Sequence, residues 1–217
     1  ETVSVKCIVV DSPDHQFLFG KTMLPTHNSG MAAGIMMTAL LENAREAAEF
    51  IIIAPTMEVA NNSFFPARNM IKSDPELADL LKPQDHIRQI THMITGATLK
   101  IVAADSDTVS GIKGTGVLIE ELWAFGKKPQ AANMLIEATG GLAARPEGFV
   151  IYLTTHADEA PAGVFRDKLT YAREVRDGKI DNNQFLPILY EFPGDMIKEK
   201  KYLDKKYFYI TNPNLGA

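Results

Sequence analysis

Residues 116–123 read Gly-Val-Leu-Ile-Glu-Glu-Leu-Trp, an uninterrupted apolar run that ends in two adjacent acidic residues. Similar apolar runs occur at residues 50–54, 99–103 and 149–153, and stretches with helical spacing separate them. Strands of a parallel sheet show this continuous apolar pattern because helices bury both faces of the sheet. The sequence therefore predicts a three-layer α/β domain built on a mainly parallel sheet.

The segments between these runs have the spacing of helices. We expect helices at residues 58–70, 75–81 and 130–139, and a further helix that starts at Ser29. Beyond residue 164 the chain is more polar, with one helix-like stretch and an extended stretch at 185–192. Four small residues would let the helix from Ser29 lie close to the sheet: Gly30, Ala32, Ala33 and Gly34.

Composition limits the class of protein. Of the 217 residues 46% are hydrophobic, which is enough for a substantial core, and the formal net charge is −5. This charge argues against a surface that coats nucleic acid nonspecifically, but it is compatible with a motor that grips DNA through one local loop. The single cysteine excludes a disulfide framework, and no apolar run approaches the roughly 20 residues that span a bilayer. Because the chain begins with Glu1, we expect a piece of a longer protein.

Glu120 and Glu121 have the arrangement of a Walker B motif, in which an apolar strand ends in two carboxylates. The first carboxylate would bind the Mg²⁺ shell, and the second would orient and deprotonate an attacking water. A serine at a helix N-terminus, here Ser29, can ligate Mg²⁺ while the helix amides bind phosphate. The plainer alternatives are a solvated acidic turn after the strand and an N-capping serine on a core helix.

Several separated strings resemble the ATPase domain of phage DNA-packaging terminase large subunits. The resemblance covers residues 29–217 and implies a RecA-like P-loop fold that binds ATP and Mg²⁺, with Ser29 and Glu120 as metal ligands. Most relatives carry Asp where this chain has Glu120, whose longer side chain could reach the metal through a water. The strings that carry the resemblance are residues 29–41, 53–68, 102–116, 116–123, 150–156 and 210–216.

The same resemblance assigns roles around the nucleotide. It makes Glu121 the catalytic carboxylate and places Ser29 and Gly30 at the phosphates. Thr154 and Thr155 match the coupling motif, whose threonines sense the γ-phosphate, although hydroxyl residues also cap strand ends routinely.

The terminase resemblance also implies a biological setting. The partners would be double-stranded DNA, the terminase small subunit and the portal of the procapsid, and the motor would be a ring of identical subunits in the cytoplasm of an infected bacterial host. The P-loop lysine of the family and the strand before it have no counterpart in this chain, and no nuclease-type acidic cluster follows residue 210.

A different chemistry is indicated by the string Thr26-His27-Asn28-Ser29. Asparagine can attack its own main-chain carbonyl with its side-chain amide, which closes a succinimide and breaks the following peptide bond. An adjacent histidine can protonate the departing nitrogen, and a following hydroxyl can hold an acyl group as an ester before a peptide bond forms. An isolated string of this kind is equally typical of an ordinary loop.

The context of this string favours the chemical interpretation. Residues 5–29 resemble the two C-terminal sequence blocks of inteins along their whole length. The resemblance assigns cyclisation to Asn28, with His27 and His15 as supporting residues, and makes Ser29 the first residue that is retained after splicing. It implies short β structure of the HINT type in this segment.

Two further residues indicate the type of intein. Cys7 and Thr26 together match class 3 inteins, in which this internal cysteine attacks the upstream splice junction; a buried strand cysteine is the alternative. We therefore expect residues 1–28 to be the C-terminal segment of an intein inserted in the Walker A motif, with an N-terminal intein and extein half as partner. Residues 29–217 would be the ATPase domain.

Two other functions fit parts of these patterns. Another P-loop motor, such as a helicase fragment, would share the acidic strand end, because the fold does not determine the function. The chain would alternatively serve as the C-terminal half of a split intein in protein trans-splicing, with the terminase portion as passenger.

Overall fold

The computed structural model describes residues 17–19, 24–26, 28–104, 114–156 and 160–212. These residues fall into two compact units. The described part of the first unit runs from Asn28 to Arg166, and the second comprises the short N-terminal strands together with residues 167–212.

The first unit contains one sheet and several helices. Its strands are β3 (Glu49–Ala54), β4 (Leu81–Gln84), β5 (Gln89–His92), β6 (Thr98–Ala103), β7 (Gly116–Glu120) and β8 (Phe149–Leu153). Its helices are α1 (Asn28–Leu41), α2 (Met57–Ser73), α3 (Pro75–Leu80), α4 (Leu122–Phe125), α5 (Ala131–Gly140) and the 3₁₀ helix η2 (Gly141–Ala144). The helix α6 (Gly163–Arg176) begins in this unit and continues into the second.

The sheet has the strand order β4-β5-β6-β3-β7-β8. The four strands β6, β3, β7 and β8 are parallel, and they include the four apolar runs of the sequence. β4 and β5 form an antiparallel hairpin that extends the sheet beyond β6. The prediction of a mainly parallel sheet is confirmed, and the hairpin is an addition that the apolar runs did not indicate.

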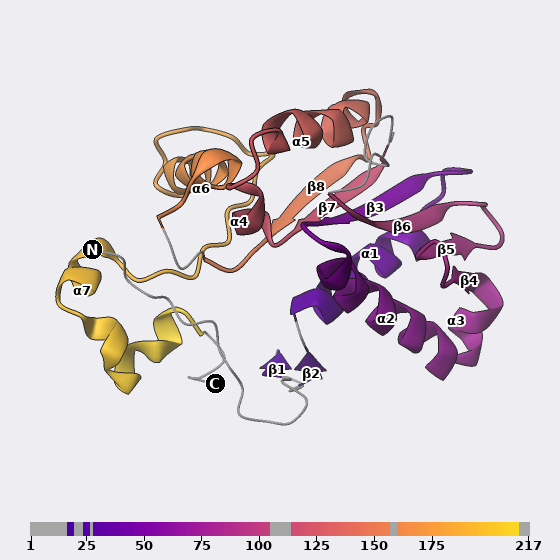
Figure 1. The fold of residues 1–217 in the computed structure, drawn as a ribbon, viewed down its shortest axis with the longest axis horizontal. Coiled ribbons are helices and arrows are strands. Elements are labelled where there is room, and N and C mark those ends of the chain that lie inside the picture. The colour runs from indigo at the N-terminus through magenta and orange to yellow at the C-terminus, as the bar shows by residue number, and fades with distance from the viewer. Residues whose placement is uncertain (1–16, 20–23, 27, 105–113, 157–159, 213–217) are drawn as a thin grey trace. The chain divides into compact units, whose positions relative to one another are not determined.

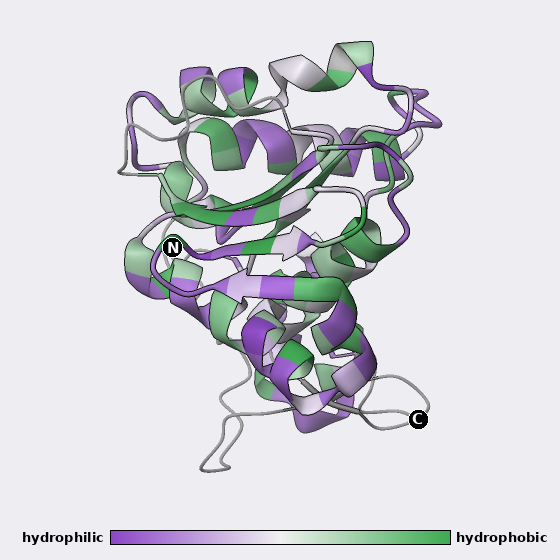
Figure 2. Cartoon of the chain, turned by 90° about the vertical axis from the view of Figure 1, so that its right-hand side faces the viewer, coloured by the Kyte–Doolittle hydropathy of each residue, from purple (hydrophilic) through white to green (hydrophobic). Residues whose placement is uncertain are grey.

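Helices cover both faces of this sheet, as Figure 1 shows. α1, α2 and α3 lie on one face, and α4 and α5 lie on the other (Figure 1). The pleat divides each strand between these two layers, since successive side chains point to opposite faces. Phe50, Ile52 and Leu118 therefore join the core formed with α1 and α2. Figure 2 shows hydrophobic residues along several strands of the sheet, while the front strands and the helices also carry hydrophilic residues.

The helix α1 is buried because its side chains are small or apolar along most of its length. Ala32, Ala33, Met36 and Leu40 are fully buried against the sheet and α2. The two alanines therefore contribute to close packing, as the sequence predicts. The prediction for Gly34 was wrong, since a Cβ atom built at that residue would meet no atom within 4 Å.

One row of three residues fixes the register of the neighbouring strands β3, β7 and β8. Phe50 of β3 and Phe149 of β8 both pair with Gly116, the first residue of β7. A Cβ atom at Gly116 would lie 2.5 Å from Cζ of Phe149 and 2.7 Å from Cδ1 of Phe50. The two rings, with centroids 6.4 Å apart, therefore occupy the space above the glycine. Slipping β7 by one residue would place the side chain of Thr115 or Val117 in this space, depending on the direction.

The second unit is built from short elements. β1 (Phe17–Phe19) and β2 (Leu24–Thr26) form an antiparallel pair in which Phe17 is opposite Thr26. The remaining elements are the end of α6, α7 (Gly194–Lys198) and the 3₁₀ helices η3 (Lys201–Leu203) and η4 (Lys205–Ile210). None of the helices that the structure describes, in either unit, is long and apolar enough to cross a bilayer.

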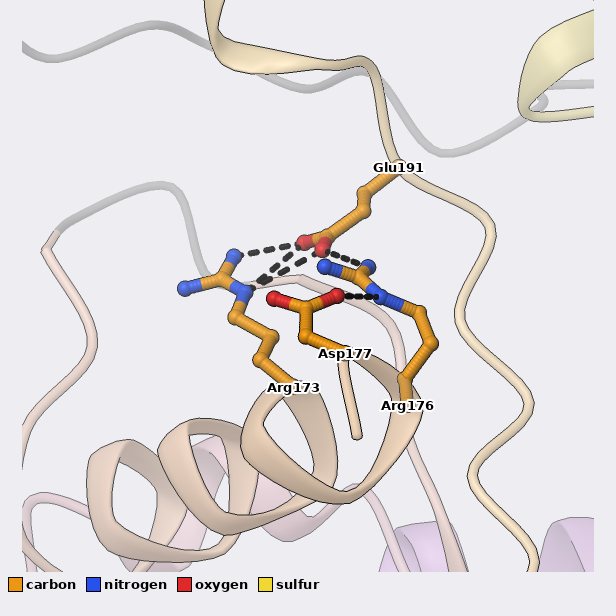
Figure 3. Close-up of polar contacts among 4 residues, drawn as sticks. All are labelled: Arg173, Arg176, Asp177 and Glu191. Atoms are coloured by element: carbon orange, nitrogen blue, oxygen red, sulfur yellow. Dashed lines mark hydrogen bonds and ion pairs between the residues drawn. The ribbon is translucent and has the colours of Figure 1, made fainter. Parts of the chain in front are cut away.

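An ion-pair cluster joins the end of α6 to a later part of the second unit (Figure 3). Arg173 donates from Nε and Nη2 to the carboxylate of Glu191, and Arg176 donates from Nη1 to Oε1 of the same residue. Arg176 also donates from Nε to Oδ1 of Asp177 at 2.8 Å. The four side chains are 23–42% exposed, so water screens the charges partly.

Candidate active site

The carboxyl ends of β3, β7 and β8 lie at the same edge of the sheet, because the three strands are parallel. Ligands of open α/β sheets bind at this edge. The N-terminus of α1 is at the same place, since the Ser29 hydroxyl donates a hydrogen bond to Oε1 of Glu120, the last residue of β7. The structure therefore brings together the two residues predicted as metal ligands, which are 91 positions apart in the sequence.

Glu120 is a buried acid with two hydroxyl partners. Only 2% of its surface is exposed, Ser29 donates to Oε1, and Ser63 donates to Oε2 at 2.6 Å. Burial raises the pKa of the Glu120 carboxyl; the hydroxyl donors act in the opposite direction, and the neighbouring charge of Glu121 adds to the rise. The net pKa lies above the ordinary value, because neutral donors solvate the carboxylate without compensating its charge.

The second hydroxyl donor, Ser63, was not predicted from the sequence. The buried residues of α2 are Ala60, Ser63, Phe64, Ala67 and Ile71, which is the spacing of one helix face. Ser63 is fully buried within this otherwise apolar stripe. A polar residue at a core position needs a hydrogen-bond partner, and that requirement is the sequence signal that would have identified it.

Glu121 follows the strand in a different conformation. Its backbone is in the left-handed region, with φ 52° and ψ 51°, which is uncommon for a residue with a side chain. Oε2 of Glu121 accepts hydrogen bonds from the indole Nε1 of Trp123 at 2.5 Å and from the hydroxyl of Thr155 at 3.2 Å. Strain of this kind costs about 1–3 kcal/mol and is concentrated at functional sites. The turn at Glu121 thus separates the two adjacent carboxylates.

The two threonines after β8 connect this strand to the turn at Glu121. The Thr154 hydroxyl accepts a hydrogen bond from the backbone N–H of Trp123 at 3.1 Å and donates to the carbonyl of Thr155 at 2.7 Å. Thr155 contacts Glu121 directly, as described above. The structure thus places both predicted threonines at the acidic end of β7.

Several predicted residues lie outside what the structure describes. Cys7, His15 and His27 are not among the described residues, and the side chains of Thr26 and Asn28 are not described either. Asn28 is the first residue of α1, and Gly30 lies in the first turn of that helix. The roles assigned to these residues stay predictions.

The oxygen atoms at this edge are of the kind that Mg²⁺ binds. Magnesium prefers hard oxygen ligands and usually takes only one or two carboxylates from the protein, together with phosphates and water. The Ser29 hydroxyl and the Glu120 carboxylate converge within hydrogen-bonding distance at the N-terminus of a 14-residue helix. A helix N-terminus presents unpaired backbone N–H groups and favours anions. These residues therefore fit a metal ion that is bound together with a phosphate.

Comparison with known proteins identifies the fold. No protein-family model and no curated protein matches the chain. Among solved structures, the large terminase of bacteriophage HK97 matches 87% of this chain with a TM-score of 0.69 and 18% sequence identity. The chain has the fold of part of a bacteriophage large terminase. A large terminase from a thermophilic bacteriophage also matches, over 82% of the chain, with a TM-score of 0.52 and 15% identity.

The matches cover less than half of each terminase. The chain spans 37% of the HK97 large terminase and 42% of the second large terminase. At 18% and 15% identity the likeness concerns the fold. The terminase fold agrees with the RecA-like architecture that the sequence resemblance implied.

Proposed function

We propose that residues 29–217 are the ATPase domain of a phage terminase large subunit, which hydrolyses ATP to drive DNA into a procapsid. The observation that carries the proposal is the contact between the Ser29 hydroxyl and the Glu120 carboxylate. It joins a helix N-terminus suited to phosphate with an acidic strand end suited to Mg²⁺. The likeness of the fold to part of a phage large terminase agrees with the family that the sequence resembles.

The carboxylates of Glu120 and Glu121 would have different roles in ATP hydrolysis. Ser29 and Glu120 would hold Mg²⁺, which neutralises charge on the β- and γ-phosphates when it is bound. Glu121, held by Trp123 and Thr155, would orient and deprotonate the attacking water. Because Thr155 bonds to Glu121, a change at the γ-phosphate that displaces this threonine would reach the strand β8.

The proposed motor acts on double-stranded DNA. Its partners are the terminase small subunit and the portal of the procapsid, and it works as a ring of identical subunits in the cytoplasm of the infected host. These elements of the proposal depend on the terminase resemblance of the sequence and the likeness of the fold.

We further propose that residues 1–28 are the C-terminal segment of an intein that interrupts the phosphate loop immediately before Ser29. The side-chain amide nitrogen of Asn28 would attack its own carbonyl carbon, and the bond to the Ser29 nitrogen would break. His27 would protonate the departing amine, while Cys7 would carry the acyl group from the upstream junction to Ser29. Ser29 then has two successive roles, as acyl acceptor and afterwards as metal ligand.

The motor part of the proposal is tested by ATP turnover. The chain itself should release negligible phosphate from ATP, because splicing has not yet supplied the phosphate-binding lysine. A protein in which a strand and a glycine-rich loop ending in Gly-Lys replace residues 1–28 should hydrolyse ATP, and its Glu121→Gln variant should not. Robust hydrolysis by the chain itself would contradict the position of the interruption.

The intein part is tested by mass spectrometry of the full chain. Incubation should release a fragment that begins at Ser29, and Asn28→Ala should prevent its release. Asn69→Ala is the matched control, because this asparagine is on the exposed side of α2. Unchanged release from the Asn28 variant would refute the cyclisation step.

A further inference from the structure

Three side chains of the candidate site form a row of hydrogen bonds. Ser29 in the first turn of α1 donates to Oε1 of Glu120, and Ser63 of α2 donates to Oε2 of the same carboxylate at 2.6 Å. Activated nucleophiles in enzymes have this arrangement, in which a hydroxyl contacts a base and a third group orients the base. The row therefore has the geometry of a nucleophile, its base and a group that holds the base in position.

Glu120 is placed to take the proton of the Ser29 hydroxyl. A general base must lie within hydrogen-bond reach of the proton that it abstracts, and the Ser29 hydroxyl donates directly to Oε1. Ser63 is fully buried and holds Oε2, so the other oxygen of the carboxylate stays directed at Ser29. Glu120 is buried, whereas Ser29 is partly exposed. The nucleophile is thus accessible, and the base is sheltered from water.

This contact depends on the fold of the domain rather than on the sequence around the splice junction. Glu120 lies 91 positions from Ser29. The two residues meet because α1 packs against the face of the sheet that contains Leu118 of β7, and β7 lies between β3 and β8. In an unfolded chain nothing holds the carboxylate at the hydroxyl. The base would therefore act only after α1 and β7 have packed together.

We propose that Glu120 is the general base for acyl transfer to Ser29 during splicing, and that Ser63 is the residue that positions it. This inference rests on the intein part of the proposed function, in which Ser29 receives the acyl group from Cys7. It gives the Walker B carboxylate a role before any metal is bound. It also makes splicing depend on the folding of the ATPase domain that splicing completes.

The proton of Ser29 moves in two steps. In the first step Oγ of Ser29 attacks the carbonyl carbon of the thioester on Cys7, so that the C–O bond forms and the C–S bond breaks. Glu120 takes the hydroxyl proton, and the departing thiolate takes a proton from water. Cyclisation of Asn28 then frees the amine of Ser29, which attacks the ester carbon; the C–N bond forms and the C–O bond breaks. Glu120 returns its proton to Oγ, the amine loses one to water, and the carboxylate is regenerated.

The test uses the full chain with Cys7→Ala and Asn28→Ala, the blocked chain, in which neither acylation of the cysteine nor cleavage takes place. The probe is 4-nitrophenyl acetate. Oγ of Ser29 attacks its carbonyl carbon, an acetyl ester forms and 4-nitrophenolate leaves. Peptide mapping by mass spectrometry measures acetylation at Ser29 at a low total extent of labelling. Treatment with hydroxylamine removes the ester and leaves acetylated lysines intact.

Three substitutions in the blocked chain separate the roles. Glu120→Gln should slow acetylation of Ser29 about a hundredfold, because glutamine keeps an oxygen that accepts the hydrogen bond but cannot take up the proton. Ser63→Ala should slow it about tenfold, which corresponds to the loss of one hydrogen bond to the base. Glu191→Gln is the matched control and should leave the rate unchanged, since the partners of Glu191 are two arginines of the second unit.

Urea separates the effect of the base from the effect of the local sequence. In urea that unfolds the blocked chain, acetylation of Ser29 should be about a hundredfold slower than in the folded chain, because Glu120 reaches Ser29 only in the fold. The Glu120→Gln variant should then react at the same rate as the blocked chain. The first comparison needs no substitution of Glu120, so the test stands even for a variant that folds poorly.

Three results would overturn the proposal. They are equal rates for the blocked chain and a folded Glu120→Gln variant, a difference between these two proteins that persists in urea, and acetylation of Ser29 in the blocked chain that is no faster in the folded state. Release of the Ser29 fragment by the chain with its native Asn28 tests the intein separately. Failure of the intein proposal and failure of the assignment of Glu120 are therefore distinguishable.

Discussion

Two glutamates, one in each unit, each accept hydrogen bonds from two side chains, yet their surroundings are opposite. Glu120 is 2% exposed and meets the hydroxyls of Ser29 and Ser63. Glu191 has a side chain that is 23% exposed and meets the guanidinium groups of Arg173 and Arg176 (Figure 3). The first carboxylate is solvated but its charge is not compensated, whereas the second is neutralised by its partners.

The pKa values follow this difference. Burial raises the pKa of Glu120, and the net pKa stays above the ordinary value. Burial alone would also raise the pKa of Glu191, but hydrogen bonds and charges from the two arginines outweigh it and lower the pKa. An uncompensated buried carboxylate is suited to receive a cation, and a neutralised one is suited to hold chain segments together.

The largest expected effect is on ATP turnover by the spliced protein. Glu120→Ala should lower turnover by at least about a hundredfold, because a bound metal stabilises transition-state charge by several kcal/mol. Glu191→Ala is the matched control and should leave turnover within about twofold, since exposed ion pairs contribute little. Phosphate release from both variants is the measurement. Similar losses of turnover in the two variants would show that Glu120 and Glu191 do not differ in function.

The next effect is on stability. Ser63→Ala should lower the free energy of unfolding by about 1–3 kcal/mol, because Oε2 of the buried Glu120 loses its donor. The double variant with Ser63→Ala and Glu120→Gln should lose less free energy of unfolding than the sum of the two single variants, since both changes disturb one contact. Urea denaturation of the four proteins measures this coupling. Strict additivity would show that the contact between Ser63 and Glu120 does not stabilise the fold.

The two carboxylates should respond to pH with opposite signs. Glu120 has a raised pKa, so its contribution to stability is present below the ordinary value of 4.5 and is lost as the pH rises through the pKa of the folded state. Glu191 has a lowered pKa, so its contribution is present above 4.5 and is lost as the pH falls through its folded-state pKa. Each unit of pKa shift corresponds to about 1.4 kcal/mol before screening by water.

Unfolding by urea from pH 3 to pH 8, in the presence of a chelator, measures this difference. The stability of the parent chain minus that of Glu120→Gln should decrease with rising pH, and the corresponding difference for Glu191→Gln should increase. If both differences changed in the same direction with rising pH, that result would contradict the pKa directions.

The smallest expected effect comes from the arginine cluster. Arg173→Ala should lower the free energy of unfolding by about 0.2–1 kcal/mol, as for other partly exposed ion pairs. High salt should reduce this loss, because it screens exposed charges, and should leave the loss caused by Ser63→Ala nearly unchanged. Repeating the denaturation in 1 M NaCl separates the two outcomes, since a salt-insensitive loss at Arg173 would point to packing.

Much of the sheet could be predicted because its strands are continuous apolar runs. β3, β6, β7 and β8 coincide with such runs, and α1 begins one residue before the predicted Ser29. The hairpin of β4 and β5 was missed, because each strand has only four residues and one of them contains Pro83. Short strands with mixed composition resemble loops in a single sequence.

The candidate site was predictable only in part. Glu120, Glu121, Thr154 and Thr155 follow apolar strands, and parallel strands bring such ends together. Ser63 does not follow a strand; its sequence signal is a polar side chain at a core position of α2, which indicates a hydrogen bond but not that Glu120 is the partner. The extended segment at 185–192 was expected, and the structure assigns neither helix nor strand to it.

The glycine at the start of β7 limits how this sheet can diverge in related proteins. Because rings from both neighbouring strands fill the space above Gly116, a change to alanine requires a smaller residue at position 50 or position 149. The three positions should therefore co-vary in an alignment of homologues, with aromatic pairs beside glycine and aliphatic residues beside alanine. Such a trio would identify distant relatives even where the acidic motif has changed.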